Sequence, residues 1–443
     1  MPETLDPTNR WTVTRDYLTP ESGGATVYWM PPPVPDAAGR LVFSGCIRPG
    51  GRVRIRHGGA VLVDLMACPG FQVAVPLRQG SYEILADLPE DRRLVWEVRD
   101  SGSEAYMRTG MTAPPQSGPD AVAPGQPFAL AGRMGQLFLG GDSNDSIGQF
   151  TESRSLTEGN AAGWSNTFRQ FPGWQKIHGL ARLSLLIAPA KEEILREYYP
   201  LPRGARTILD DFVSRFRDPA PILPKWELWN RRDLAWSRTD THWTDYGAAV
   251  AAAAVLKAWG LPSTGPDSGL PETWRLRQRI GDLGSKVQPQ VSSHELTFLP
   301  EVPARLVFDN GVTNQGNIRL YRHPQAPQPG RLLIFGDSFG TNLAEAFSGV
   351  FAEVAYAYQP AGFDPELVAA IQPDHVLLQI TQRFLHGQPA TGKPVFAKAR
   401  DKIAALPQDK RVALLARLAA APAEFAPLTA PLIAPVPDLA SGT

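Results

Sequence analysis

Residues 331 to 340 read RLLIFGDSFG, a short apolar stretch that leads into a turn with a serine. A buried strand followed by Gly-Asp-Ser is how one large class of esterases presents its nucleophile. In a parallel sheet this turn would place Ser338 at the ligand-binding edge, beside a helix N-terminus whose free N–H groups can hold an oxyanion. Gly336 permits the turn and Gly340 permits close approach of a substrate. The stretch is equally consistent with an Asp337–Ser338 pair that caps a helix.

A second Gly-Asp-Ser lies in GQLFLGGDSND, residues 135 to 145. Ser143 has polar residues on both sides and no apolar helical stripe directly after it. Asp, Asn, Ser and Gly in succession are typical of a turn. We therefore predict a turn after a strand here, in a segment that could line a pocket.

A serine nucleophile needs a base, and the base needs a partner that fixes its tautomer. The candidate bases are the histidines at 57, 178, 242, 294, 323, 375 and 386. None has the HExxH spacing of a zinc site, so we predict neither a metal nor a cofactor.

His242 stands out because it lies in RTDTHWTDYG, just before a long alanine-rich segment. Asp240 is two residues upstream, so the two side chains can bond within one loop and the carboxylate would raise the basicity of the imidazole. Trp243 could shield the pair from water. Without Ser338 as a partner, an exposed loop pair would be the better interpretation. A rival arrangement pairs Ser338 with a downstream histidine, His375 or His386.

The elements that must position these residues form an α/β pattern from about residue 128. Apolar runs at 183–188, in RLLIF and in HVLLQI predict buried strands, and helical segments alternate with them. The stretch TDYGAAVAAAAVLKAWGLP predicts a helix with Thr244 as its N-cap and Gly260 as its stop. Residues 396–420 predict a closing helix.

Four regions follow from composition and pattern. Residues 1–111 show short alternating strands with turn residues between them, including a hairpin around Gly58-Gly59, and predict an all-β sandwich domain. Residues 112–127 are rich in Pro, Gly and Ala and predict a linker. We assign 128–420 to the α/β domain and 421–443 to a flexible tail.

Charge and hydropathy limit the partners. The 443 residues carry 44 basic and 44 acidic side chains, and this balance argues against a general nucleic-acid or anionic-membrane binder. No stretch approaches the roughly 20 apolar residues that span a bilayer. The first residues show no signal peptide, so we expect a cytoplasmic protein from the sequence as written, or a periplasmic one if the N-terminus has been trimmed.

The stretch from about 128 to 390 resembles the SGNH-hydrolase-like family of the alginate O-acetylation proteins in bacterial exopolysaccharide systems. Five segments agree in order: GRMGQLFL, LLIAPAKEEI followed by YYP, DTHW, GDSF, and QPDHVLLQITQRFL. The order is specific, because ordinary SGNH esterases carry the serine first and the Asp/His pair near the C-terminus. The resemblance implies a three-layer α/β sandwich with a mostly parallel sheet.

The resemblance also implies roles. The DxHW and GDSF-like motifs carry over as a triad of Asp240, His242 and Ser338, which would form an acetyl-serine. Backbone N–H groups near Ser338 and Phe339 would hold the oxyanion. The implied oxyanion and substrate contacts lie at Phe339, Gly340, Asn342, Arg383 and Trp243. Arg383 could bind an acidic sugar or help shape the site, and a structural salt bridge is an equal alternative.

Three departures from the family pattern stand out. Gln382 replaces a common acidic residue, Gln136 replaces a common tryptophan, and no signal is visible although most members are exported. The first two affect fine details of the site. The third leaves the compartment and the acetyl donor open.

The function that we expect is serine-dependent acetyl transfer to or from a glycan. The partners implied are a glycan, an acetyl donor that the sequence does not identify, and a membrane-bound acyltransferase or glycosyltransferase. The alternatives are a carbohydrate acetylesterase with the same triad, and a non-catalytic glycan-binding or scaffold protein of an assembly complex. The β domain would bind carbohydrate or serve packing; fold alone does not decide between these.

Overall fold

The computed structural model describes residues 128–434 apart from 197, 263–273, 300 and 390–393, together with ten strands among the first hundred residues. The predicted linker, 112–127, and residues 435–443 lie outside the described residues. The early strands are β1 (Pro2–Glu3), β2 (Trp11–Thr14), β3 (Tyr28–Trp29), β4 (Val34–Pro35), β5 (Arg40–Ile47), β6 (Gly51–His57), β7 (Ala60–Ala67), β8 (Gly70–Pro76), β9 (Ser81–Asp87) and β10 (Arg93–Asp100).

These early strands pair antiparallel in two sheets. Strands β6 and β7 form a hairpin register in which His57 pairs with Ala60. Val53 and Ile55 on β6 are buried while Arg52 is exposed, as their alternation predicts. That the two sheets pack as a sandwich stays a prediction.

A six-stranded mixed sheet forms the centre of the α/β region, in the order β13-β20-β18-β19-β17-β16. Its strands are β13 (Arg182–Ala188), β16 (Leu306–Asp309), β17 (Ile318–Arg322), β18 (Gln328–Gly336), β19 (Phe351–Tyr358) and β20 (His375–Thr381). The first four in spatial order run parallel, and β17 and β16 join antiparallel at one edge. The predicted α/β class is confirmed, with an antiparallel edge that the sequence did not indicate. Two short antiparallel pairs flank the sheet: β11 (Ala129–Ala131) with β12 (Leu137–Leu139), and β14 (Trp274–Arg279) with β15 (Ser293–Phe298).

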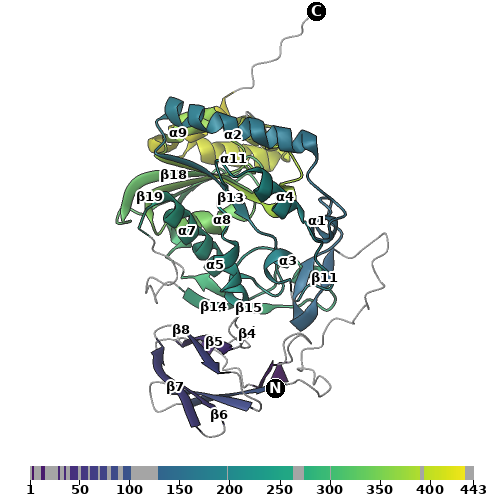
Figure 1. The fold of residues 1–443 in the computed structure, drawn as a ribbon. Helices are drawn as coiled ribbons and strands as arrows, with labels where there is room; N and C mark the ends of the chain where they lie inside the picture. The colour runs from purple at the N-terminus through teal and green to yellow at the C-terminus, as the bar shows by residue number, and fades with distance from the viewer. Residues whose placement is uncertain are drawn as a thin grey trace, which may run out of the picture.

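Helices cover both faces of this sheet (Figure 1). Successive strand residues face opposite cores: Leu333 and Phe335 of β18 enter one buried cluster, and Leu332 and Ile334 enter the other. A strand buried on both sides has no polar face, which explains the continuous apolar run LLIF. The helices are α1 (Ser146–Thr151), α2 (Glu158–His178), α3 (Lys191–Ile194), α4 (Ile208–Arg215), α5 (Lys225–Trp229), α6 (Arg232–Ala235), α7 (Asp245–Trp259), α8 (Gly340–Phe347), α9 (Pro365–Ile371), α10 (Val395–Ala404), α11 (Gln408–Ala419) and α12 (Ala426–Ile433).

Helix α7 has the predicted ends. The Thr244 side chain accepts a hydrogen bond from the N–H of Gly247, and Gly260 closes the helix in the left-handed conformation with a φ of 69°. The alanines of α7 pack against α8, so the loop before α7 lies next to the turn before α8. This packing brings the two candidate segments together.

The C-terminal region differs from its prediction in two ways. The single closing helix predicted at 396–420 is two helices, α10 and α11, because Pro407 interrupts the pattern. Residues 423–433, predicted as part of a flexible tail, form a 3₁₀ turn and α12, and Phe425, Leu428 and Leu432 are buried in the core. The assignment of these residues to a flexible tail is therefore wrong.

Among the described residues, no single helix is long and apolar enough to cross a membrane. One bent pair, Gln408–Ala419 with Ala423–Ile433, passes the same test by length and composition alone, with 108° between its halves.

Candidate active site

Ser338 lies in the turn between β18 and α8, at the carboxyl end of a central parallel strand. The turn is fixed by its neighbour Asp337, which is fully buried. The Asp337 carboxylate accepts hydrogen bonds from the N–H of Thr381 (2.6 Å) and from the Gln379 side chain (3.0 Å) on β20. Asp337 therefore holds the serine turn to the neighbouring strand.

His242 and Asp240 lie in the loop that leads into α7. The Asp240 carboxylate contacts Nδ1 of His242 at 2.7 Å and also accepts the backbone N–H of His242 at 2.8 Å. Nε2 of the same ring lies 2.8 Å from Oγ of Ser338. With an ionised Asp240, Nδ1 carries the proton and Nε2 is left to accept from the serine hydroxyl. The three predicted residues thus form one hydrogen-bonded chain.

Asp240 is partly buried, and burial by itself raises the pKa of its carboxyl. The hydrogen bonds and charge of His242 outweigh burial, so the net effect holds the pKa of Asp240 well below its ordinary value. Asp240 therefore stays ionised over the neutral pH range, as an orienting carboxylate must.

Asp282, which the sequence analysis did not single out, supports the same loop. Its carboxylate accepts the N–H and the hydroxyl of Thr241 at 2.8 and 2.5 Å, and its own N–H donates to Asp240 at 3.2 Å. One Asp282 oxygen lies 3.7 Å from Nδ1 of His242. Burial, and then the charge of Asp240, raise the pKa of Asp282.

Asp240, His242 and Asp282 offer three potential metal-ligand atoms within 4.8 Å of one another. A metal on Nδ1 of His242 would replace the proton that Nδ1 donates to Asp240, across an N···O distance of 2.7 Å. The second Asp240 oxygen already accepts from the Asp282 N–H. This donor arrangement fits an orienting hydrogen bond better than a metal site.

Lys191 anchors the loop that carries Asp240 and His242, which we call the histidine loop. Its side chain is 3% exposed, and its amine contacts the carbonyls of Leu137, Ser237, Arg238 and Asp240 at 2.6 to 3.2 Å. Burial lowers the pKa of Lys191 to about 7, against the opposing pull of the Asp240 charge. The lysine of the LLIAPAKEEI segment thus acts on the position of the loop that bears Asp240.

The residues expected to hold an oxyanion are engaged elsewhere. The N–H of Phe339 donates to the Asp337 carboxylate at 3.0 Å, and the N–H of Gly340 donates to the Asp337 carbonyl at 2.9 Å. A Cβ on Gly340 would lie 2.5 Å from the ring of Tyr356, so this glycine permits packing rather than substrate approach. These findings correct the expectation for the N–H groups of Phe339 and Gly340, and the Asp337 contacts leave out the N–H of Ser338, the other implied donor.

Asn342 and Trp243 also have internal partners. The Asn342 amide donates to Asp245 at 2.7 Å, which ties α8 to the start of α7. The Trp243 ring is 2% exposed, packs edge-on against Phe339 and donates to the Phe339 carbonyl at 3.2 Å. Trp243 therefore joins the histidine loop to the serine turn, which is a structural role rather than a substrate contact.

Two polar side chains remain close to the serine turn. The Arg383 guanidinium lies 5.8 Å from the centre of the Phe339 ring, and no carboxylate in the described part of the chain comes within ion-pair distance of it. The structure thus does not show the salt bridge considered as an alternative for Arg383. Tyr358 ends β19 opposite Gly336 in the sheet register. Burial raises the pKa of Tyr358, and hydrogen bonds with the Ser338 side chain and backbone oppose that rise.

The other candidates lie apart from this chain. Ser143 is exposed in a turn after β12, as predicted. His375 begins β20 and stacks on Trp259, so it lies at the opposite end of the strands from Ser338. His386 contacts Arg154 and Asn144 instead. The structure therefore does not support the serine-first rival.

Both glutamines that depart from the family pattern are buried. The Gln382 side-chain oxygen accepts the N–H of Ala190 at 3.1 Å, which ties the end of β20 to the loop before Lys191. The Gln136 side-chain oxygen has no hydrogen-bond partner among the described residues. The hydrogen bond to Ala190 thus explains the glutamine at position 382, and nothing in the structure explains the glutamine at position 136.

Comparison with known proteins gives partial matches. No family model matches the chain. The chain is 31% identical over 173 residues to the probable alginate O-acetylase AlgJ of Pseudomonas putida, and the match covers 36% of this chain and 42% of that protein. The chain thus matches less than half the length of this relative.

Three solved structures are similar in part. Bacillus cereus PatB1 is 11% identical with a TM-score of 0.45, covering 59% of this chain and 98% of that one. The O-acetyltransferase domain of Pseudomonas putida AlgJ is 18% identical with a TM-score of 0.37, covering 65% and 99%. A DHHW family protein from Eubacterium siraeum is 16% identical with a TM-score of 0.38, covering 59% and 96%.

Proposed function

We propose that this protein is an SGNH-type serine acetyltransferase that moves an acetyl group onto a glycan hydroxyl through an acetyl-Ser338 intermediate. The observation that carries the proposal is the position of His242, whose two ring nitrogens contact Asp240 at 2.7 Å and Ser338 at 2.8 Å. The 173-residue similarity to a protein named as an alginate O-acetylase supports the acetyl group and the glycan as reactants.

In the first half-reaction, Oγ of Ser338 attacks the acetyl carbonyl of the donor while Nε2 of His242 takes the hydroxyl proton. The tetrahedral intermediate collapses, the bond to the leaving group breaks, and His242 returns the proton to that group. In the second half-reaction a glycan hydroxyl attacks acetyl-Ser338, again with His242 as base, and Ser338 recovers its proton. Asp240 keeps the imidazole in the required tautomer throughout.

Asp337 already uses the N–H groups of Phe339 and Gly340. The developing oxyanion therefore has the N–H of Ser338, which the resemblance implies, and needs a second donor beside it. The Tyr358 hydroxyl lies beside Ser338, and its raised pKa keeps a proton on it that it can donate. We assign this role to Tyr358. A single such donor is typically worth about 10²- to 10³-fold in rate.

The test uses the two Gly-Asp-Ser serines as a matched pair. Ser338→Ala should abolish turnover of p-nitrophenyl acetate, and Ser143→Ala should leave it unchanged because Ser143 is exposed in a turn. Turnover that survives Ser338→Ala would remove Ser338 from the mechanism. A glycan-binding protein without activity would bind glycan and fail to react with a serine-directed fluorophosphonate.

Water and a sugar hydroxyl can both accept the acetyl group from Ser338, so an acetylesterase would share the first half-reaction. Measuring acetate and acetylated sugar together separates the two activities. A membrane-bound acyltransferase or glycosyltransferase is the partner that we propose for delivery of the acetyl group.

A further inference from the structure

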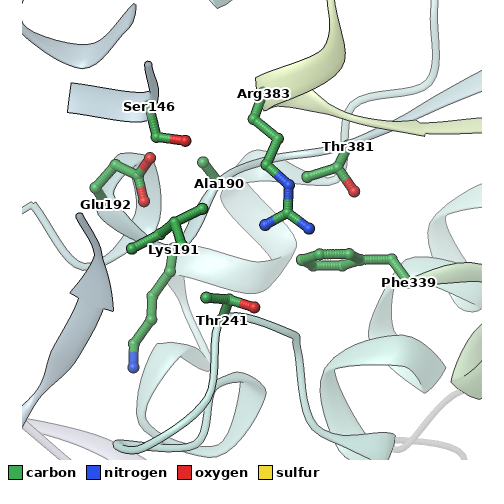
Figure 2. Close-up of a pocket in the computed structure, with 9 residues that line it drawn as sticks. Ser146, Ala190, Lys191, Glu192, Thr241, Phe339, Thr381 and Arg383 are labelled. Carbon is green, nitrogen blue, oxygen red and sulfur yellow. The ribbon is translucent and has the colours of Figure 1, made fainter. Parts of the chain in front are cut away.

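A small pocket opens beside the proposed triad (Figure 2). It shares Thr241 with the histidine loop and Phe339 with the serine turn. Its other lining residues are Leu139, Ser146, Ala190, Lys191, Glu192, Thr381 and Arg383. It has room for a small polar group rather than a whole sugar ring.

Two hydroxyls in this pocket are buried without a partner, and one buried carboxyl group lies beside them. The hydroxyls of Ser146 and Thr381, at 2% and 1% exposure, have no hydrogen-bond partner among the described residues. The Glu192 side chain is 5% exposed, and nothing in the described chain beyond its own backbone N–H reaches its carboxyl group. Buried polar groups in this state are costly, so their position in one pocket points to a ligand.

The pocket also contains one available cationic group. Figure 2 shows the Arg383 guanidinium among the lining side chains and the Lys191 amine directed away from them. The Lys191 amine is held by four carbonyls, whereas Arg383 rests on the Phe339 and Phe384 rings. Arg383 is close enough for its charge to act on Glu192, yet the two are not an ion pair within the described structure.

The opposite charges of Glu192 and Arg383 in one small pocket favour an uncharged ligand. A carboxylate would satisfy Arg383 but would meet Glu192, and an ammonium would satisfy Glu192 but would meet Arg383. A sugar hydroxyl both donates and accepts, so it can bond to Glu192, Arg383 and the Ser146 and Thr381 hydroxyls. The four side chains therefore match an uncharged hydroxyl-bearing group.

We propose that this pocket binds a hydroxyl or hydroxymethyl group of an uncharged acceptor sugar, through Glu192 and Arg383, next to acetyl-Ser338. The inference rests on the proposed function and adds to it the class of acceptor: a neutral sugar rather than a uronate. A neutral acceptor sugar differs from the alginate that appears in the name of the O-acetylase relative.

The ionisation of Glu192 agrees with this assignment. Burial raises the pKa of Glu192 to about 7, against the lowering effect of Arg383. Above that pH the carboxylate is ionised, so it accepts a hydrogen bond from a sugar hydroxyl and repels a second carboxylate.

The test uses two acceptors that differ at one carbon, methyl glucoside and methyl glucuronoside. With p-nitrophenyl acetate as donor, the readout is the ratio of acetylated sugar to acetate at equal acceptor concentration. We expect the wild-type protein to favour the glucoside by at least tenfold. Above pH 7, Glu192→Ala and Glu192→Gln both remove the charge that rejects a carboxylate, so both should bring the two ratios close together.

Glu366→Gln, an exposed glutamate on α9, is the charge-matched control and should behave as wild type. Equal or better use of the glucuronoside by the wild-type protein would overturn the inference. So would a preference that Glu192→Ala leaves unchanged, or acetate release with neither sugar acetylated. If the proposed function itself is wrong, Ser338 carries no acetyl group and Ser338→Ala still releases acetate, which separates the two failures.

Discussion

Nε2 of His242 lies 2.8 Å from Oγ of Ser338, although the two residues are 96 positions apart in the chain. The packing of α7 against α8 produces this contact, because α7 begins at Asp245, shortly after His242, and α8 begins at Gly340, shortly after Ser338. The Trp243 indole and the Asn342 amide add two hydrogen bonds between the same segments. The imidazole and the hydroxyl are thus held together by the core rather than by a flexible loop.

Asp240→Asn should reduce turnover of p-nitrophenyl acetate by about 10³- to 10⁴-fold, since an amide at this position favours the wrong imidazole tautomer. His242→Ala should have a similar effect. The double variant should be no worse than either single one, because the two residues act as a unit. Full additivity of the two losses would argue that Asp240 and His242 do not work together.

Asp282→Asn should lower kcat by about tenfold and change KM little, since Asp282 positions Thr241 and Asp240 without reaching Ser338. The measurement is steady-state kinetics beside a thermal unfolding curve. Asp401→Asn, at an exposed position on α10, serves as a carboxylate control for stability. A loss as large as that of Asp240→Asn would instead make Asp282 a member of the reacting group.

Lys191→Met should destabilise the fold by roughly 3 kcal/mol, because four carbonyls lose a buried cationic donor. Activity of the folded fraction should fall as well, since the loop of Asp240 loses its anchor. Lys257→Met, at an exposed position on α7, is the control. Chemical denaturation of both variants checks the prediction, and equal stabilities would show that Lys191 does not hold the loop.

Stability should depend on pH through Glu192. Its pKa in the folded protein is about 7, above its ordinary value of 4.5, so the folded state binds more protons than the unfolded state between these values. The free energy of unfolding should therefore fall as the pH rises from about 4.5 to about 7. Glu192→Gln removes this loss, so the variant should gain up to about 3 kcal/mol over wild type across that range and keep the gain above it. A difference that does not change with pH would contradict the shift.

The local pattern of the sequence was enough to predict the main candidate residues. A continuous apolar run followed by Gly-Asp-Ser predicted the strand and turn at Ser338, and the Thr244 cap fixed the start of α7 directly after His242. Both signals are local, and the cores on the two faces of the sheet then bring the segments together.

The remaining features depend on contacts that no local pattern records. Asp282 lies in a polar stretch whose importance appears only when its N–H and carboxylate reach Asp240 and Thr241. The N–H of Phe339 was expected to be free because the turn precedes a helix, yet the buried Asp337 uses it. Residues 426–433 were expected to be loose because of their prolines, but Leu428 and Leu432 find a place in the core.

The most direct test of the account is to look for the acetyl group on Ser338. Wild-type protein is mixed with p-nitrophenyl acetate, stopped in acid within the first turnovers, digested and examined by mass spectrometry. We predict one acetyl group on the peptide that contains Ser338, formed much more slowly in His242→Ala and absent in Ser338→Ala. Acetate released without an adduct on Ser338, or an adduct that forms equally fast without His242, would contradict the account.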